Sequence, residues 1–467
     1  DDLCYSDTRY YRATLKSAVS GRNKKGVVFV KAAGNGGNSP VLRNPDDANF
    51  DPLNTLPWHI VVGAVNASGV KASYSTPGSS LWISAPAGEY GWQGDPSQIF
   101  VDTPKWSQKP IDPNAEPPQE FIEYELKFTK ELAPLSRFSP AIITTDLTYT
   151  GSEGQDGLKP CEFGYARSYE FFDTKPEHLE KGAGASGFNL GYHSENLNCD
   201  YTATMNGTSA AAPFVAGVVA LMLEKNPDLT WRDVKHILAS TAQKIDENIG
   251  DEEIAVGSPS SRLVRTHAWK RNNAGYNFHN YYGFGLVNAE AAVKMADPLT
   301  YKPLPPNISF VENAEVLSCA GFDSLDENET TNVEEGEPNP FGNFWEFTRF
   351  DGPGGIPQNS TKGVTKTVKV NKNVTIEALT FQVNINGENM SHIGIEVTSP
   401  SGMSSILLPP VNSADYKNFT NMVFTTNAFY GEKSAGLWTM KFVDAKASAI
   451  AAATVNEISL RIWGYRE

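Results

Sequence analysis

The chain has little of what marks metal-binding or membrane-spanning proteins. Its 467 residues include only four cysteines, Cys4, Cys161, Cys199 and Cys319, and none belongs to a CxxC pair. We therefore expect no zinc site built on cysteines. No run of about 18 apolar residues occurs, so the sequence predicts no membrane span. It starts at Asp1 without an initiator methionine or a charged leader, which predicts a piece of a longer chain.

Basic residues are also scarce relative to acidic ones. The chain has 39 lysines and arginines against 54 aspartates and glutamates, for a net charge of −15. This balance argues against nucleic acid or an anionic membrane as partner. It suits basic substrates, Ca²⁺, or simple solubility, and composition alone leaves these three open.

The most informative stretch is residues 206–213, which read Asn-Gly-Thr-Ser-Ala-Ala-Ala-Pro. The apolar run that follows predicts one helix ending near Lys225, and this helix is apolar nearly all round, as in a buried core. Pro213 is tolerated in the first turn of a helix, which places Ser209 at the helix start. A small, uncrowded serine beside free backbone N–H groups suits a nucleophile that acylates. An ordinary N-cap serine would look the same.

Short apolar strands precede this helix. Residues 26–33, 60–65 and 81–85 read as buried strands, and their alternation with helices predicts a parallel α/β sheet. Ligands bind beyond the carboxyl ends of such strands, and Asn35 lies just past one of these ends. After the serine helix, residues 230–240 predict a helix that opens with a capping box. We expect a loop from there to residue 280.

Composition changes twice more along the chain. Residues 88–140 are rich in proline and charge, and residues 148–200 follow a short strand at 141–147. We interpret both as insertions in a first domain that spans residues 1–300. Beyond a proline-rich linker the periodicity becomes two, as in the strand around Val364–Val370, which predicts an all-β sandwich over residues 301–467.

The motif Gly207–Pro213 resembles the serine signature of the subtilisin-like proteases, in the kexin and proprotein-convertase branch. Residues 33–37, 226–234 and 282–289 resemble other motifs of that branch, in the same order. Stretches 395–402 and 436–440 look like the P (Homo B) domain that follows kexin catalytic domains. The resemblance implies a three-layer subtilisin-like α/β domain, present in part, followed by a β-sandwich.

The resemblance also implies roles for single residues. Ser209 would be the nucleophile, and Asn35 would donate to the oxyanion, together with the backbone N–H of Ser209. Asn35 could also be a simple turn residue, because Gly-Asn-Gly-Gly is a good turn sequence.

Several acidic residues fall where the family has functional carboxylates. Asp1, Asp2 and Asp51 match acids that bind Arg or Lys before the scissile bond, and Asp46 and Asp47 match structural Ca²⁺ ligands. A solvated acidic loop would also account for Asp46 and Asp47. Thr76 stands where the family has a Ca²⁺-binding Glu after Tyr-Ser, which weakens the calcium prediction.

The catalytic histidine and aspartate of the family are the missing part. In subtilases both precede the oxyanion asparagine, yet no histidine precedes Asn35 here. The chain's histidines are not in a catalytic context; they are His59, His178, His193, His236, His267, His279 and His392. His193 is the one that could approach Ser209 as a replacement. The simpler interpretation is that this is the C-terminal part of a protease whose N-terminal segment carries both residues, and that it is inactive alone.

We therefore expect a secreted kexin-like serine endopeptidase that cleaves protein substrates after basic residues. A propeptide or a folding chaperone is a candidate partner, and an oxidising compartment would allow two disulfides, of which we favour Cys161–Cys199 among three connectivities. An inactive subtilase-fold protein and a binding or adhesion module remain as alternatives. The β domain should stabilise the first domain, with Leu437 and Trp438 in its most buried strand.

Overall fold

A computed structural model describes residues 8–37, 45–89, 140–146, 196, 200–305, 343–349, 353–414, 416–446 and 452–466. The chain divides into two compact units. The first comprises residues 1–63, 75–85 and 211–467, and the second comprises residues 64–74 and 86–210.

A three-stranded sheet of order β1-β2-β3 lies in the middle of the first unit. Its strands are β1 (Phe29–Ala32), β2 (His59–Val65) and β3 (Ile83–Pro86), and the end of β2 continues into the second unit. Strands β1 and β2 run parallel, with Phe29 opposite His59 and Ala32 opposite Val62. Every residue of β2 is buried, as the apolar run over residues 60–65 predicts. The parallel α/β sheet is confirmed.

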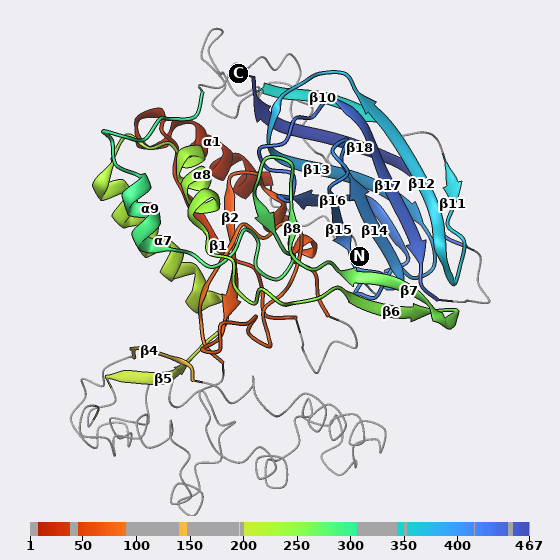
Figure 1. The fold of residues 1–467 in the computed structure, drawn as a ribbon, viewed down its shortest axis with the longest axis horizontal. Helices are drawn as coiled ribbons and strands as arrows, with labels where there is room; N and C mark the ends of the chain where they lie inside the picture. The colour runs from red at the N-terminus through yellow and green to blue at the C-terminus, as the bar shows by residue number, and fades with distance from the viewer. Residues whose placement is uncertain are drawn as a thin grey trace, which may run out of the picture. The chain divides into compact units, whose positions relative to one another are not determined.

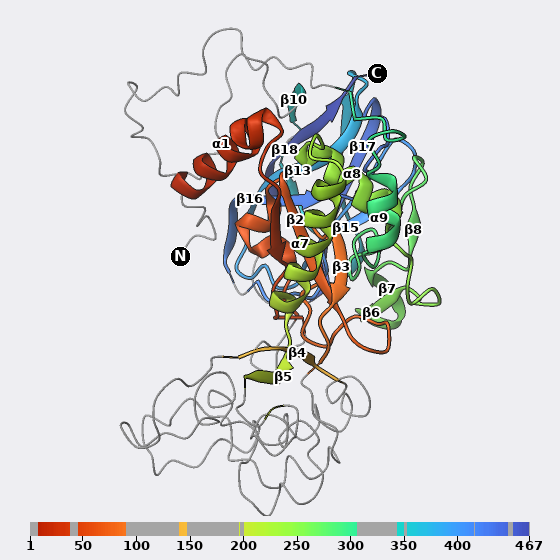
Figure 2. The same ribbon diagram turned by 90° about the vertical axis from the view of Figure 1, so that its left-hand side faces the viewer.

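The described residues of this part include the helices α1 (Thr8–Lys24), α7 (Thr208–Lys225), α8 (Trp231–Thr241) and α9 (Ala289–Met295). Figures 1 and 2 show α7, α8 and α9 on one face of the sheet. Helix α8 starts with the predicted capping box, in which Thr230 and Asp233 satisfy each other's backbone N–H groups. The box fixes where α8 begins.

Helix α7 is only half buried, although its sequence predicts burial on all sides. Val215 and Met222 are fully buried on one face, but Phe214 and Leu221 are 46% and 49% exposed on the other. Its length and composition would allow it to cross a membrane, and 39% of it is buried within the fold. The buried face makes it a core helix of this unit, one face of which is uncovered by the described residues.

The loop expected over residues 241–280 is wrong. This region forms the antiparallel hairpin of β6 (Glu252–Val256) and β7 (Ser258–Thr266), and then the short pair β8 (Lys270–Arg271) and β9 (Asn277–Phe278). Half of the strand residues in the hairpin are exposed, and few are large apolar side chains, so no apolar alternation marks the strands. Val256 and Leu263 of the hairpin pack against Val443 of the later domain, with the partly buried Ile254 and Ala445 beside them.

The C-terminal strands form the predicted antiparallel sandwich, drawn in blue in Figure 1. One sheet has the order β10-β18-β13-β16, with β11 added beside β18, and the other has the order β12-β17-β14-β15. The strands are β10 (Asn343–Arg349), β11 (Gly354–Gly355), β12 (Ser360–Val370), β13 (Thr375–Asn386), β14 (Ile393–Thr398), β15 (Ser404–Leu408), β16 (Asn418–Thr426), β17 (Gly436–Asp444) and β18 (Thr454–Tyr465). Neighbours in β17 alternate, so of the two residues placed in a buried strand Trp438 is fully buried whereas Leu437 is 55% exposed.

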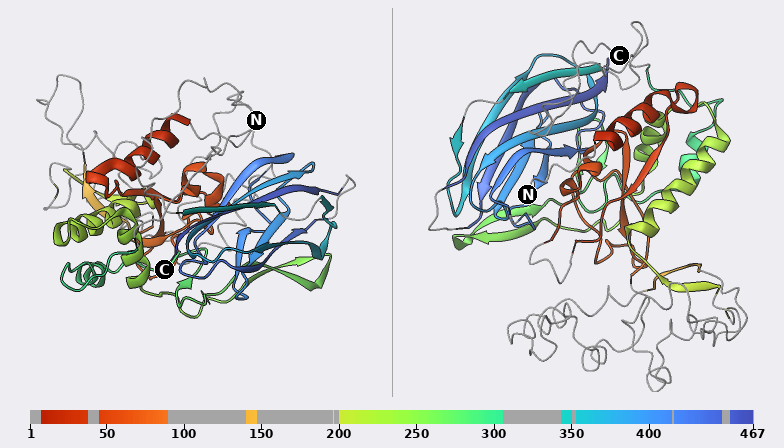
Figure 3. Two further views of the ribbon diagram at one scale, coloured as in Figure 1. Left: turned by 90° about the horizontal axis from the view of Figure 1, so that it is seen from above. Right: turned by 180° about the vertical axis from the view of Figure 1, so that it is seen from behind.

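Within the first unit, the sandwich lies beside the helix–sheet part (Figure 3). Polar groups form hydrogen bonds between the two. The short helices η1 (Ala48–Phe50) and η2 (Pro52–Thr55) contact β16 there. The fully buried Asn49 amide donates to Ser79 Oγ at 3.0 Å and accepts from the Thr425 N–H at 2.8 Å. Asn427 Nδ2 donates to the Ser80 carbonyl at 2.8 Å. Because these hydrogen bonds are directional and buried, they fix how the sandwich packs on the helix–sheet part.

The second unit contains the antiparallel pair β4 (Ile142–Thr145) and β5 (Tyr201–Met205). In this unit the buried Glu89 carboxylate accepts from the Ser73 N–H at 2.7 Å and from the Ser73 hydroxyl at 2.8 Å. The strand predicted at 141–147 is confirmed. Most of both predicted insertions, and all four cysteines with the Cys161–Cys199 pair, lie outside the described residues.

Candidate active site

Ser209 lies in the first turn of α7, as predicted. Strand β5 ends at Met205, Gly207 turns the chain with a φ of 89°, and the helix starts at Thr208. A side chain at Gly207 would be strained in that conformation. Thr208 and Ala211 are fully buried on either side, whereas Ser209 is exposed. The hydroxyl is therefore accessible at the positive end of a helix.

Pro213 does not lie in the first turn of α7. It is inside the helix, whose first residue is Thr208. Because proline has no N–H, it cannot donate to the carbonyl of Ser209, four residues earlier. The predicted place of Pro213 in the first turn is therefore wrong, although Ser209 does lie near the helix start.

Asn35 lies on a short loop that directly follows β1. The Gly36 N–H donates to Thr76 Oγ1 at 2.9 Å, and the Thr76 N–H donates to the Gly34 carbonyl at 3.0 Å. The buried Thr76 thus holds the chain on both sides of Asn35, whose own side chain is exposed. Gly34 has a φ of 120°, a conformation open to glycine. Such a fixed loop suits a donor that must be in place before charge develops.

Asp46 packs against the same loop. Its N–H donates to the Gly36 carbonyl at 3.1 Å. Its Oδ1 accepts from the Asp47 N–H and from the Ser413 hydroxyl of the sandwich, both at 3.0 Å. Burial raises the pKa of the Asp46 carboxyl above its usual range. The structure therefore brings Asp46 beside Asn35 but uses its carboxylate within the fold.

Asp47 is almost completely buried, at 2% exposure. It caps η1 by accepting from the Asn49 N–H at 2.9 Å, and burial raises the pKa of its carboxyl to about 8. Calcium needs about six oxygen ligands, usually with several carboxylates. The described part of the chain has no group of three or more His, Cys, Asp or Glu side chains that could hold a metal. Asp46 and Asp47 alone do not fit a calcium site.

Asp51 caps η2 and already has a cationic partner. Its Oδ1 accepts from the Leu53 N–H at 2.9 Å, and its Oδ2 pairs with Lys31 Nζ at 2.5 Å. The carboxylate side chain is 41% exposed. A basic substrate side chain would share this acid with Lys31. Asp1 and Asp2, the other predicted pocket acids, lie outside the described residues.

The described histidines have structural partners. His59 Nδ1 lies 2.7 Å from the Leu53 carbonyl, and burial lowers the pKa of this ring to about 4. His236 pairs with the Tyr430 hydroxyl at 2.9 Å, and His267 pairs with Glu396 at 2.8 Å. His178 and His193 lie outside the described residues.

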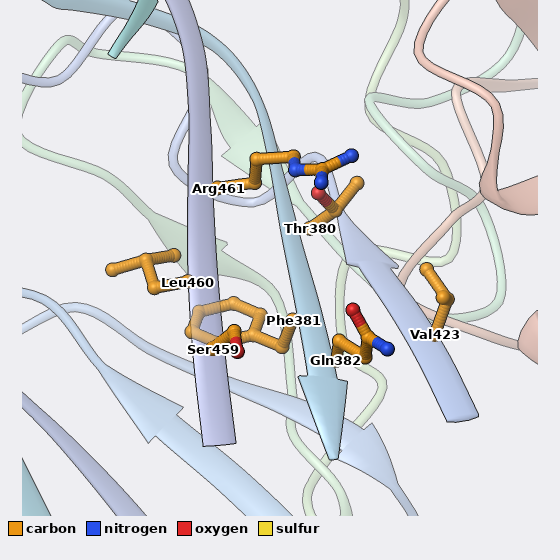
Figure 4. Close-up of a pocket in the computed structure, with 7 residues that line it drawn as sticks. All are labelled: Thr380, Phe381, Gln382, Val423, Ser459, Leu460 and Arg461. Atoms are coloured by element: carbon orange, nitrogen blue, oxygen red, sulfur yellow. The ribbon is translucent and has the colours of Figure 1, made fainter. Parts of the chain in front are cut away.

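A small pocket between β18, β13 and β16 of the sandwich contains no predicted site residue (Figure 4). Its lining is Thr380, Phe381, Gln382, Val423, Ser459, Leu460 and Arg461. We assign it no part in the chemistry of Ser209.

Two residues beside the Asn35 loop were not predicted as site residues. Thr76 stands out in sequence only as a departure from the family pattern, and its hydroxyl proves to hold Gly36. Ser413 comes from the second domain, where no local pattern marks it. Only the three-dimensional contact with Asp46 reveals it.

Comparison with known proteins identifies the family of this chain. The model of the subtilase family (peptidase S8) matches residues 4–285, and that of the proprotein convertase P-domain matches residues 376–462. The extracellular serine protease of Aeromonas sobria is 26% identical over 474 residues, covering 95% of this chain and 58% of that protein. Kexin from Candida albicans (strain WO-1) is 24% identical over 467 residues, covering 99% of this chain and 34% of kexin.

A solved structure agrees with the fold. The crystal structure of the Aeromonas sobria serine protease with its chaperone ORF2 matches with a TM-score of 0.69 at 22% identity. The match covers 100% of this chain and 69% of that one. The chain thus spans less than two thirds of the two sequence relatives' own length.

Proposed function

Because this chain belongs to the subtilase family, we propose that it is part of a serine endopeptidase that hydrolyses peptide bonds through an acyl-enzyme on Ser209. The observation that carries the proposal is the exposed Ser209 hydroxyl in the first turn of α7, inside the family's serine motif. The Ser209 oxygen attacks the peptide carbonyl as a base takes its proton. The amine then leaves with a proton, and water hydrolyses the ester.

Asn35 is the proposed side-chain donor to the oxyanion. The charge on the former carbonyl oxygen exists only at and near the tetrahedral intermediate, so a donor fixed beforehand stabilises mainly the transition state. The bonds from Thr76 and Asp46 to the Gly34–Gly36 loop support this role, because they order the loop without substrate.

The base and its orienting acid are proposed to come from a segment upstream of residue 1. The chain covers 58% of its Aeromonas relative, and one face of α7 carries exposed Phe214 and Leu221. Both observations support a catalytic domain that is larger than residues 1–300. In this proposal, residues 1–300 are the C-terminal part of that domain and residues 301–467 are the P domain.

Replacing Asn35 by alanine in the complete protein should lower kcat by about 10²–10³, with KM little changed; this is the loss measured for one such donor in subtilisin. The measurement is steady-state hydrolysis of a peptide substrate. Asn248→Ala, an exposed asparagine in the segment after α8, serves as control. An unchanged kcat in Asn35→Ala would remove this residue from the chemistry.

We further propose cleavage after Arg or Lys. Asp46, Asp47 and Asp51 follow the Asn35 loop within one short segment, and the chain has a net charge of −15. Similarity to kexin supports the same preference. The Lys31–Asp51 ion pair should weaken this preference, because the Lys31 ammonium competes for the carboxylate that a substrate cation would use.

Peptides with Arg or Lys before the scissile bond should be cut about 10- to 100-fold faster than those with Leu or Gln, the worth of one charge-assisted hydrogen bond. Asp51→Asn should reduce this ratio of kcat/KM values. Asp228→Asn is the matched control, because Asp228 also pairs with a lysine, Lys25 at 2.7 Å, but is largely exposed. Equal ratios in wild type and Asp51→Asn would exclude Asp51 from the pocket.

Secretion and a folding partner complete the proposal. The Aeromonas sobria relative is named an extracellular protease, and its crystal structure includes a chaperone. These names support a secreted protein that folds with a chaperone or a propeptide. Structural Ca²⁺ would need ligands beyond Asp46 and Asp47, and we assign it no step.

A further inference from the structure

A loop of the sandwich presents Ser413 in a fixed position. Its neighbours Asn412 and Ala414 are both fully buried. The Asn412 side chain donates to the carbonyls of Pro409 at 3.0 Å and Ile393 at 3.1 Å, and it accepts from the Ala414 N–H at 2.9 Å. With one buried amide bonded on three sides, the loop has little freedom to move Ser413.

The Ser413 hydroxyl begins a chain of contacts that ends at the Asn35 loop. It donates to Asp46 Oδ1 at 3.0 Å, which also accepts from the Asp47 N–H at 3.0 Å. The Asp46 N–H in turn donates to the carbonyl of Gly36 at 3.1 Å. The residue after Asn35 is thus linked to the sandwich by two consecutive hydrogen bonds through one residue.

The contact between Asp46 and Gly36 is also close enough to transmit a shift. A Cβ atom on Gly36 would lie 2.7 Å from the Asp46 Cβ, so the backbone at Gly36 is packed tightly against Asp46. Burial disfavours the Asp46 carboxylate, and the Ser413 hydroxyl offsets that effect by donating to it. Without the Ser413 hydroxyl, the half-buried Asp46 carboxylate would lose one hydrogen bond and would shift toward other donors or solvent.

We propose that Ser413 is a positioning residue through which the sandwich domain holds the oxyanion loop: its hydroxyl fixes Asp46, and Asp46 fixes Gly36 beside Asn35. The inference rests on the proposed role of Asn35. It gives the P domain a specific part in catalysis beyond stabilising its neighbour. Because Asn35 would act on the transition state, loosening its loop should lower kcat and leave KM nearly unchanged.

The first test needs no activity. In residues 1–467, Ser413→Ala should speed hydrogen exchange of the Gly36, Asp46 and Asp47 amides by about 2- to 10-fold, the effect of one lost hydrogen bond. Ser413→Thr, which keeps the hydroxyl, should restore slow exchange. Unchanged exchange at these three amides in Ser413→Ala would overturn the proposal.

Ser401→Ala is the matched control. Ser401 donates to Glu432 Oε1 at 2.9 Å, and the same oxygen accepts from the Asn273 N–H at 2.7 Å. This is the same serine–carboxylate–amide pattern, but these bonds do not involve Asp46 or Gly36. If Ser401→Ala speeds exchange at Gly36 as much as Ser413→Ala does, the effect is general loosening and the proposal is wrong.

The second test is kinetic and uses the complete protein. Ser413→Ala should lower kcat by about 2- to 10-fold with KM within about twofold, and Ser401→Ala should lower neither. A rise in KM without loss of kcat would contradict positioning of the oxyanion loop. Asn35→Ala, measured in parallel, separates the two ideas. An unchanged kcat there refutes the proposed function, whereas normal exchange and kcat in Ser413→Ala refute only the positioning role.

Discussion

Ser209→Ala in the complete protein should lower kcat by about 10⁶, as loss of the corresponding nucleophile does in subtilisin. Without the hydroxyl no acyl-enzyme forms, and water must attack the peptide directly. The variant should still hydrolyse the peptide about 10³–10⁴-fold faster than the uncatalysed reaction, because the oxyanion donors and substrate contacts remain. The measurement is kcat for one peptide substrate at saturation.

The control for this variant is Ser240→Ala, near the C-terminal end of the next helix, α8. The Ser240 hydroxyl lies 3.4 Å from the Tyr276 hydroxyl in an exposed setting, so its loss should change neither kcat nor folding. A Ser209→Ala protein that retains more than a small fraction of wild-type kcat would show that another group is the nucleophile.

Trp438→Ala should destabilise the protein by about 3–5 kcal/mol, the usual cost of truncating a large aromatic in a packed core. Trp438 is fully buried, its ring meets Phe429 edge-to-face at 5.1 Å, and its Nε1 donates to the Ser434 carbonyl at 2.8 Å. A domain has about 5–15 kcal/mol of stability in total, so most of this protein should fail to accumulate in soluble form. Urea unfolding of the soluble fraction measures the loss.

Leu437→Ala is the neighbouring control. Leu437 is 55% exposed on the other side of β17, so its truncation should change stability by less than about 0.5 kcal/mol. If residues 1–300 joined to their upstream segment fold and cleave normally without residues 301–467, the sandwich does not stabilise the catalytic domain. It would then have to be explained as a binding module.

What could be predicted from sequence depended on how local the signal was. The capping box from Thr230 to Asp233 spans four residues and was placed correctly. The period-two pattern identified the sandwich strands, but taking Leu437 together with Trp438 ignored the alternation that the same pattern implies. The β6–β7 hairpin was missed because its exposed strands bury few apolar side chains.

Long-range contacts left no trace in the sequence. Asp46 could be recognised as an acid in a functional region, but its partner Ser413 is 367 residues away and lies in another domain. Asp51 read as a free pocket acid because nothing local marks Lys31 as its partner. Thr76 appeared only as a missing glutamate. These roles depend on which surfaces pack together, which periodicity and spacing do not encode.

The most direct test of the central claim is to treat the complete protein with a fluorophosphonate and map the adduct by peptide mass spectrometry. An activated serine attacks phosphorus and expels fluoride, so a working triad should yield one phosphonylated peptide, modified at Ser209, together with loss of peptidase activity. Ser209→Ala should give no adduct. Absence of label on Ser209 in protein that still cleaves peptides, or label on another serine, would contradict the account. Absence of both label and cleavage would identify an inactive member of the family.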